Sequence, residues 1–212
     1  DDDATTDEGL LKAIRVIEQS DIGELLLWIS IPCTGGCPLQ DKNWARYVRT
    51  NDTRGMANLE AHWALFRVLW ARVETLIKLA LAKGAIIVIE WPSRCKYWND
   101  PAVRKFLGAL RDPGTGTKVR PNTVITHGCM FNARTKAGRP IMKPWRITAI
   151  AREPSLGQKF AQGMRRTCDG QHEHASCRGK DLKRSEHYPP GFVQAVHKCF
   201  ADYVIGLRVL NL

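Results

Sequence analysis

Apolar and polar positions follow two kinds of pattern along the chain. Two short continuous apolar runs, residues 25–31 and 85–89, are typical of buried strands in a parallel sheet. Between them, apolar residues recur at helical spacing over residues 55–83, and Gly84 ends the pattern. The order strand, helix, strand predicts a crossover unit that joins two parallel strands.

Other segments extend this arrangement. Residues 8–19 and 101–110 have helical patterns, and Asp100 can cap the second helix. Further helices are expected over residues 156–166 and 192–205, and further strands over 124–126 and 145–150, with a turn at 136–140. We therefore expect an α/β fold with a short, mainly parallel, Rossmann-like sheet and flanking helices. The expected parts are an acidic start and lead-in helix (1–23), an α/β domain (24–166), and a Cys/His loop with a C-terminal helix (167–212).

The charge distribution is uneven. Residues 1–24 contain eight acidic and two basic side chains, so the remaining 188 residues have 30 Lys and Arg against 13 acids. A positive field of this size attracts polyanions and makes DNA or RNA the expected partner. The alternatives are a solvated basic surface and a basic subunit within a larger complex.

Cysteine usage and hydropathy bear on the compartment. Seven cysteines without close, even spacing do not form a secreted disulfide framework, so we expect an intracellular, reducing compartment, either nucleus or cytoplasm. No membrane association is expected, because the longest apolar region is interrupted by Arg67, Arg72, Glu74 and Lys78. Since the chain has no initiator Met, we expect a fragment or processed piece that an upstream domain or second subunit completes.

Cys33 and Glu90 follow the two predicted buried strands. Ligands of open α/β sheets bind beyond the carboxyl ends of the strands, where a thiol nucleophile and an acid would be placed. Pro32 restricts the backbone, and Gly35 and Gly36 allow a substrate to approach closely. A partly desolvated carboxyl group has a raised pKa and can hold a proton. Alternatively, Cys33 is a small core residue and Glu90 is paired or solvated.

A second group of chemically active side chains lies within residues 168–177. Soft sulfur and nitrogen ligands at short spacing suit a tetrahedral zinc ion, and Gly170 eases the turn. The predicted ligands are Cys168, His172, His174 and Cys177. The spacing differs from that of standard zinc fingers, and the alternative is a polar loop whose cysteines only pack.

Basic and aromatic residues intermingle in two places. Arginine can bind a phosphate or a base carbonyl through its planar fork, and bases stack on aromatic faces. The candidate nucleic-acid-binding residues are Trp91, Lys96 and Trp98 after the second strand, and Arg134, Lys136, Arg139, Lys143 and Trp145 around the later turn. The alternatives are a core or lid cluster for the first group and an exposed hairpin surface for the second.

In chain order these pieces resemble the later part of the cytosine-5 DNA methyltransferase catalytic domain. The matching positions are Pro32-Cys33, Glu90-Trp91-Pro92 and the region of Arg146. The chain is more closely similar to methyltransferase-like domains of retroelement polyproteins, over approximately residues 24–200. The shared motifs are residues 31–36, Glu-Trp-Pro with the following Cys-Lys-Tyr-Trp, Gly128-Cys129-Met130, Lys143 to Arg146, and Cys168 to Cys177 ahead of Tyr188-Pro189-Pro190.

The resemblance implies a methyltransferase-like sheet and specific roles. In that family the Cys thiolate adds to carbon 6 of cytosine, the Glu hydrogen-bonds ring nitrogen 3, and the ring takes a methyl group from S-adenosylmethionine. Cys33 would be the nucleophile, Glu90 its acid partner and Arg146 an orienting group. Trp91 stands where the family has Asn, the usual Gln after the Cys is missing, and the glycine-rich cofactor strand would lie upstream of residue 1. S-adenosylmethionine would thus bind only if an upstream segment or partner completes the site.

Two classes of function remain open at this stage. The first is a nucleic-acid methyltransferase-like domain of the cytosine-5 type, or its remnant. The second is a non-catalytic, basic, zinc-containing nucleic-acid-binding module or a basic subunit of a larger complex. For the catalytic class, the pKa of the Cys33 thiol should be lowered, so that Cys33 reacts faster than Cys95, Cys129 or Cys199.

Overall fold

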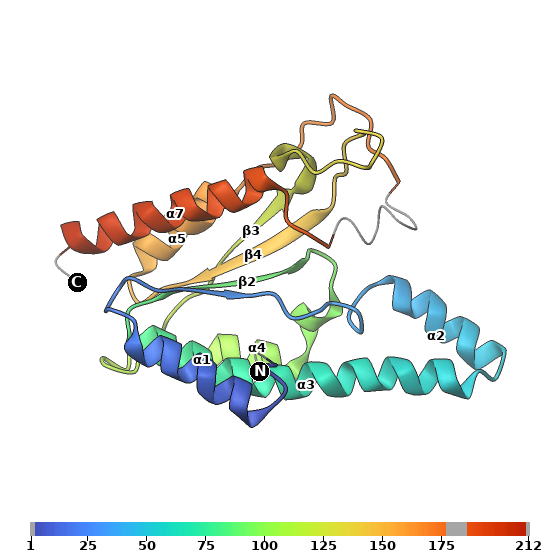
Figure 1. Cartoon of the computed structure of the whole chain (residues 1–212), viewed down its shortest axis with the longest axis horizontal. Helices are drawn as coiled ribbons and strands as arrows, with labels where there is room; N and C mark the ends of the chain where they lie inside the picture. The colour runs from blue at the N-terminus through green and yellow to red at the C-terminus, as the bar shows by residue number, and fades with distance from the viewer. Residues whose placement is uncertain (1–2, 177–185, 211–212) are drawn as a thin grey trace.

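A computed structural model describes residues 3–176 and 186–210. Its centre is a four-stranded sheet in the order β1-β2-β4-β3, with helices on both faces (Figure 1). The strands are β1 (Leu26–Ile29), β2 (Ile86–Pro92), β3 (Asn122–His127) and β4 (Pro144–Ile150). The helices are α1 (Asp7–Gln19), α2 (Leu39–Arg49), α3 (Thr53–Ala82), α4 (Pro101–Ala109), α5 (Pro154–Met164) and α7 (Pro190–Val209), with short 3-10 turns η1 (Lys96–Asn99) and η2 (Gly128–Phe131).

The α/β class and the flanking helices are confirmed, but the expectation of a mainly parallel sheet is wrong. β1 and β2 are parallel, as the crossover through α3 requires, whereas β4 pairs antiparallel with both β2 and β3. The physical reason is the connection: residues 128–143, between β3 and β4, contain the short turn η2 but no crossover helix, and a return without such a helix joins antiparallel neighbours. β4 then lies between β2 and β3.

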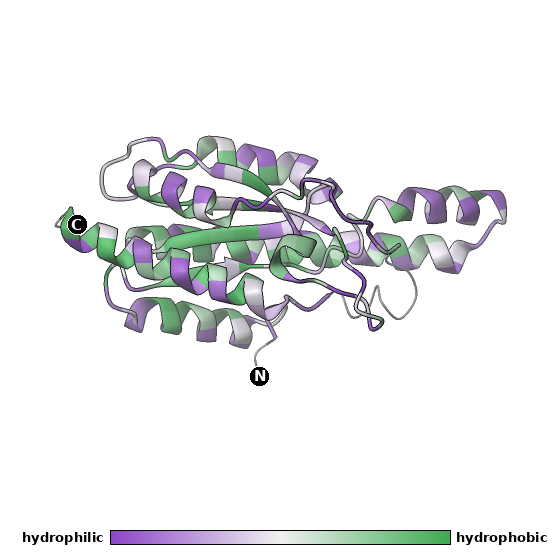
Figure 2. Ribbon diagram, turned by 90° about the horizontal axis from the view of Figure 1, so that it is seen from above, coloured by the Kyte–Doolittle hydropathy of each residue, from purple (hydrophilic) through white to green (hydrophobic). Residues whose placement is uncertain are grey.

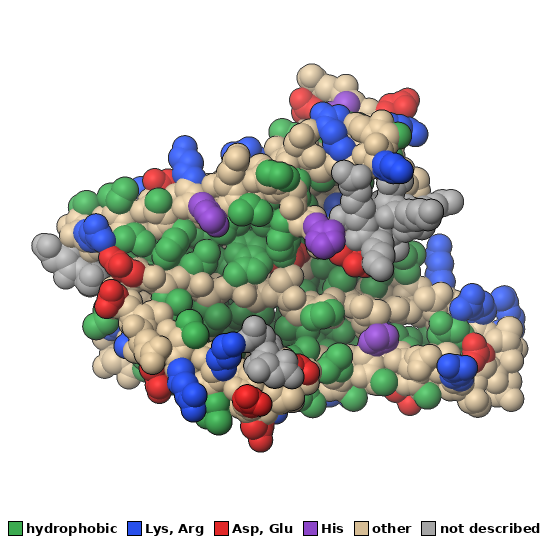
Figure 3. Space-filling model, viewed as in Figure 1, with side chains coloured by type: hydrophobic (Ala, Val, Ile, Leu, Met, Phe, Trp, Pro, Cys, Tyr) green, Lys and Arg blue, Asp and Glu red, His purple; other side chains and the backbone are tan. Residues whose placement is uncertain are grey.

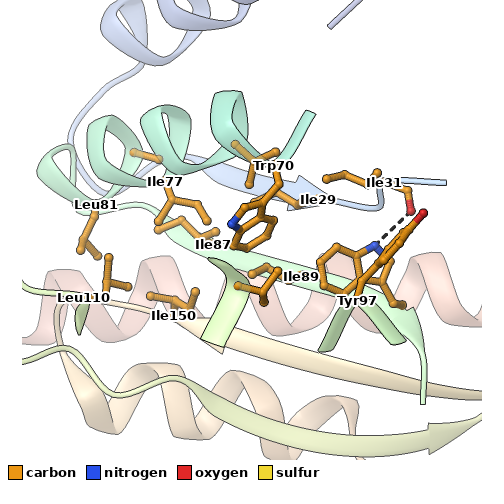
Figure 4. Packing of buried hydrophobic residues seen from close by; sticks show 14 of the residues in the cluster. Ile29, Ile31, Trp70, Ile77, Leu81, Ile87, Ile89, Tyr97, Leu110 and Ile150 are labelled. Atoms are coloured by element: carbon orange, nitrogen blue, oxygen red, sulfur yellow. Dashed lines mark hydrogen bonds between the residues drawn. The ribbon is translucent and has the colours of Figure 1, made fainter. Parts of the chain in front are cut away.

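Each face of the sheet is covered by a separate apolar core. On one face, α3 contributes Phe66, Trp70, Ile77 and Leu81, which pack on Ile87 and Ile89 of β2 (Figure 4). On the other face, residues of α5 and α7 pack on alternate strand positions such as Ile86, Val88 and Ile147. The alternation follows from the strand geometry, in which successive side chains point to opposite faces.

Helix α2 is the one described helix that the apolar pattern did not predict. None of its residues is buried, and the apolar residues Trp44, Tyr47 and Val48 make too short a stripe for α2 to be recognised as a core-facing helix. It folds back along the first half of α3, and the two helices extend beyond the sheet as an arm (Figures 1 and 2). Among residues 3–176 and 186–210, no helix is both long and apolar enough to cross a bilayer.

Candidate functional site

Four metal-ligand side chains meet at one end of the sheet. The ligand atoms of Cys129, Cys168, His172 and His174 all lie within 4.8 Å of one another. The Cys168 Sγ atom is 3.6 Å from His172 Nε2 and 3.5 Å from His174 Nε2. Cys129 Sγ is 3.4 Å from the same His174 nitrogen. Side chains at these separations can surround one metal ion.

Hydrogen bonds hold the ligand segment against the end of β3. The backbone N–H of Cys168 donates to His127 Nδ1 at 2.9 Å, and the N–H of His127 donates to the Arg166 carbonyl at 2.8 Å. The Ala175 N–H donates to the Pro140 carbonyl at 2.8 Å. Gly170 adopts a φ of +80° that suits glycine, as its predicted role in the turn requires. Both ends of the Cys/His segment are thus fixed.

The sequence analysis identified three of these four residues. Cys168, His172 and His174 come together as predicted, whereas Cys177 lies outside the described residues. Cys129 was not predicted as a ligand, because it is far from the others in sequence and reaches them only through the β3–β4 connection. A signal was nevertheless available, since Cys129 lies three residues after the end of the predicted strand 124–126.

Glu90 and Cys33 line a cavity of about 310 Å³ beyond the ends of β1 and β2. Glu90 is only 4% exposed. Its Oε2 accepts hydrogen bonds from the Tyr188 hydroxyl and, at 3.1 Å, from the Ser30 hydroxyl. Its Oε1 is buried and has no hydrogen-bond partner among the described residues. The cavity wall therefore contains one unsatisfied carboxyl oxygen, a group that rarely stays unpaired in a protein interior.

Burial is the largest influence on the ionisation of the Glu90 carboxyl and the Cys33 thiol. It raises the pKa of the Glu90 carboxyl, and the hydrogen bonds from Tyr188 and Ser30 offset part of this rise. Burial, the nearby Cys37 thiol and Glu90 also raise the pKa of the Cys33 thiol. This direction is opposite to the lowered pKa that the catalytic class of function requires of Cys33. Apolar surroundings outweigh the opposing influence of Lys143.

Arg146 does not join Cys33 and Glu90. It is paired across the sheet with Trp91, and directly paired residues lie on the same face, so Arg146 is on the face opposite to Glu90. Its guanidinium lies 4.4 Å from the centre of the Trp98 ring, and its buried Nε has no partner in the described part of the chain. In this structure Arg146 is packed among aromatic rings rather than directed at the cavity.

The three candidate tryptophans are core residues in this conformation. Trp91 and Trp145 are 1% exposed and Trp98 is 5% exposed. The indole N–H groups of Trp91 and Trp98 donate to the carbonyls of Ile31 and Pro92, the first of which is drawn in Figure 4. A nucleic-acid base cannot stack on such faces unless the surrounding side chains move. Lys96, the remaining candidate of the group with Trp91 and Trp98, forms an ion pair with Asp41.

The later basic candidates surround a second cavity of about 540 Å³. Arg134, Lys136 and Lys143 line it, and it shares Lys143, Trp145 and Tyr188 with the Glu90 cavity, so the two adjoin. Arg134 donates to Asn132 and to the Gly138 carbonyl, which shapes the turn, and Arg139 is exposed beside it. Lys143 has a φ of +24°, a strained value for a residue with a side chain. We call the cavity lined by Arg134, Lys136 and Lys143 the basic groove.

The Glu90→Gln substitution tests the environment of this carboxyl group. Because the folded-state pKa is raised above the ordinary value of 4.5, the contribution of Glu90 to stability is fully present below that value and is lost as the pH rises toward the raised pKa. Urea unfolding between about pH 4.5 and 8 should show the wild type losing stability relative to Glu90→Gln. The matched control is Glu60→Gln, which removes an exposed carboxyl from α3. A pH-independent difference between wild type and Glu90→Gln would contradict the assignment.

Comparison with known proteins gives no relative. The chain matches no family model, no curated protein and no solved structure.

Proposed function

We propose that this domain is a zinc-binding nucleic-acid-binding module. Zinc would be held by Cys129, Cys168, His172 and His174, and the nucleic acid would lie along the adjoining basic groove. The observation that carries the proposal is the separation of the ligand atoms, which matches a tetrahedral coordination shell of the kind that zinc adopts.

The match can be calculated from bond lengths. Zinc–sulfur bonds are about 2.3 Å and zinc–nitrogen bonds about 2.0–2.1 Å, so in a tetrahedral site a sulfur and a nitrogen lie about 3.5 Å apart. Three of the four sulfur–nitrogen separations in the cluster are 3.6, 3.5 and 3.4 Å. Two thiolates and two imidazoles also form a complete ligand set for structural zinc, with no position left for a substrate. This supports a structural rather than a catalytic ion.

The two thiols also fit a divalent cation electrostatically. Burial and the neighbouring Cys168 raise the pKa of the Cys129 thiol to about 11, so ionisation of the Cys129 thiol is unfavourable without a nearby cation. A bound zinc ion stabilises the thiolate form of its ligands. It would also join η2 to the Cys/His segment, and so fix one wall of the region in which the basic groove lies.

Charge supports nucleic acid as the partner. Between Arg134 and Arg184 the sequence has 13 Lys and Arg against four acids. Arg134, Lys136 and Lys143 of this segment line the basic groove. Binding through such residues depends mainly on phosphate contacts and counterion release, so we expect little sequence preference and strong salt dependence.

The zinc ligands can be tested by metal analysis. The purified chain should contain about one zinc ion, and Cys129→Ser or Cys168→Ser should lose most of it, because three ligands bind structural zinc far more weakly than four. Cys37→Ser is the matched control, since Cys37 is a free thiol outside the cluster. Full zinc content in Cys129→Ser, with loss in Cys177→Ser, would show that the sequence-based ligand set was the correct one.

The basic groove can be tested through the salt dependence of binding. In Lys136→Gln/Arg139→Gln, two exposed cations are removed, and the slope of log affinity against log salt on duplex DNA should become shallower by about two. Arg104→Gln/Lys105→Gln removes the same charge from exposed positions on α4 and should change the slope little. Failure of the wild type to bind any duplex or single strand at low salt would contradict the proposed function.

A second candidate is base chemistry of the cytosine-5 methyltransferase type. The observation that favours it is the unpartnered Oε1 of Glu90 in a cavity that Cys33 also lines. The raised pKa of Cys33 and the position of Arg146 count against it in this conformation. Only this candidate requires S-adenosylmethionine, with an upstream segment or partner to complete its site, so calorimetric titration with that cofactor separates the two.

A further inference from the structure

The arm formed by α2 and α3 is built by specific local contacts. Asp52 caps α3 by accepting from the Gly55 N–H at 2.8 Å, and the Tyr47 ring of α2 packs on Gly55. A Cβ atom at position 55 would lie 2.5 Å from that ring, so the close approach of the helices requires glycine there. Asn51, in the left-handed region at φ +52°, reverses the chain between the helices.

The packing of the core does not explain why α2 is so polar and exposed. An 11-residue helix is marginal by itself, and this one buries no residue that would anchor it in the core. Its outer surface includes Trp44 at 39% exposed and Val48 at 55% exposed. Solvent-facing helices of this kind are commonly interaction surfaces.

Three cations form a stripe on α2. Lys42, Arg46 and Arg49 are all exposed, and their spacing of four and three residues places them on one side of the helix. Arg54, at the start of α3, adds a fourth exposed cation near the tip. Figure 3 shows Lys and Arg side chains gathered over this end of the molecule.

Carboxylates of the arm do not neutralise the stripe. Asp41 forms an ion pair with Lys96, and Asp52 is occupied as a helix cap. Within residues 3–176 and 186–210, none of Lys42, Arg46, Arg49 and Arg54 forms an ion pair with a carboxylate. The field of the stripe is therefore directed outward, toward solvent or a partner.

We propose that the Lys42–Arg46–Arg49 stripe of α2 is a second nucleic-acid contact, which binds the phosphate backbone apart from the basic groove. It extends the proposed function and rests on it. At 1.5 Å per helical residue the stripe is about 10 Å long, which matches the span of about four successive phosphates of one strand, spaced about 3.4 Å along the axis of a duplex. The arm and the Cys/His segment extend from the same end of the sheet, so one nucleic acid could contact both (Figure 1).

The test is the variant Lys42→Gln/Arg46→Gln/Arg49→Gln in the full chain, with binding to a duplex measured at several salt concentrations. Loss of three phosphate contacts should make the slope of log affinity against log salt shallower by about three and weaken binding at least about tenfold near 0.1 M salt. The matched control, Arg104→Gln/Lys105→Gln/Lys159→Gln, removes three exposed cations from α4 and α5. It should change the slope much less, because its cations lie outside the arm. Circular dichroism of each variant verifies that the helices are retained.

The outcomes separate this inference from the proposed function. If the wild type binds duplex and the groove variant weakens it, but the α2 variant keeps the wild-type slope, then the arm inference alone is wrong. If the control lowers the slope as much as the α2 variant does, overall charge is responsible and the inference is again wrong. If the wild type binds no nucleic acid but the stripe binds an acidic protein, both proposals fail.

Discussion

The burial of β2 is the constraint on which the rest of the structure depends. This strand is paired on both edges, by β1 and β4, and six of its seven residues are buried. A strand covered on both faces must be apolar, and β2 is apolar except at Glu90. The ionisable group is therefore near the end of the strand, where Tyr188 and Ser30 supply hydrogen bonds to one of its oxygens. The other oxygen, Oε1 of Glu90, has no hydrogen-bond partner among the described residues, and Glu90 lines the cavity.

Because β4 is antiparallel to β2, several candidate functional residues lie at the end of the sheet where Glu90 is found. Because β4 runs opposite to β2, its first residues, Pro144 and Trp145, lie beside the last residues of β2. β3 runs opposite to β4, so His127 and the following Cys129 also reach this end. A purely parallel sheet would have placed the start of β4 at the other end. The departure from the expected topology is thus what brings the Cys/His cluster, the basic groove and Glu90 together.

Local patterns predicted the helices and strands that contribute to the core, because burial imposes a period that can be recognised in the sequence. They also identified Glu90 and three ligands of the cluster, since those residues are close in sequence or interrupt an apolar run. Cys129 and α2 were missed for opposite reasons. Cys129 joins the cluster only through long-range strand pairing, and α2 buries no residue that would create a pattern. Trp91 and Trp98 could equally have been binding faces or core, and only the packed structure places them in the core.

The central claim is that a Cys₂His₂ zinc ion organises this end of the sheet. X-ray absorption at the zinc edge of the purified chain measures this most directly. Our account predicts two sulfur neighbours at about 2.3 Å and two nitrogen neighbours at about 2.0–2.1 Å, with one sulfur lost from the zinc that Cys129→Ser still binds when excess zinc is added. A shell of oxygen and nitrogen neighbours without sulfur, or a shell unchanged by Cys129→Ser, would contradict it.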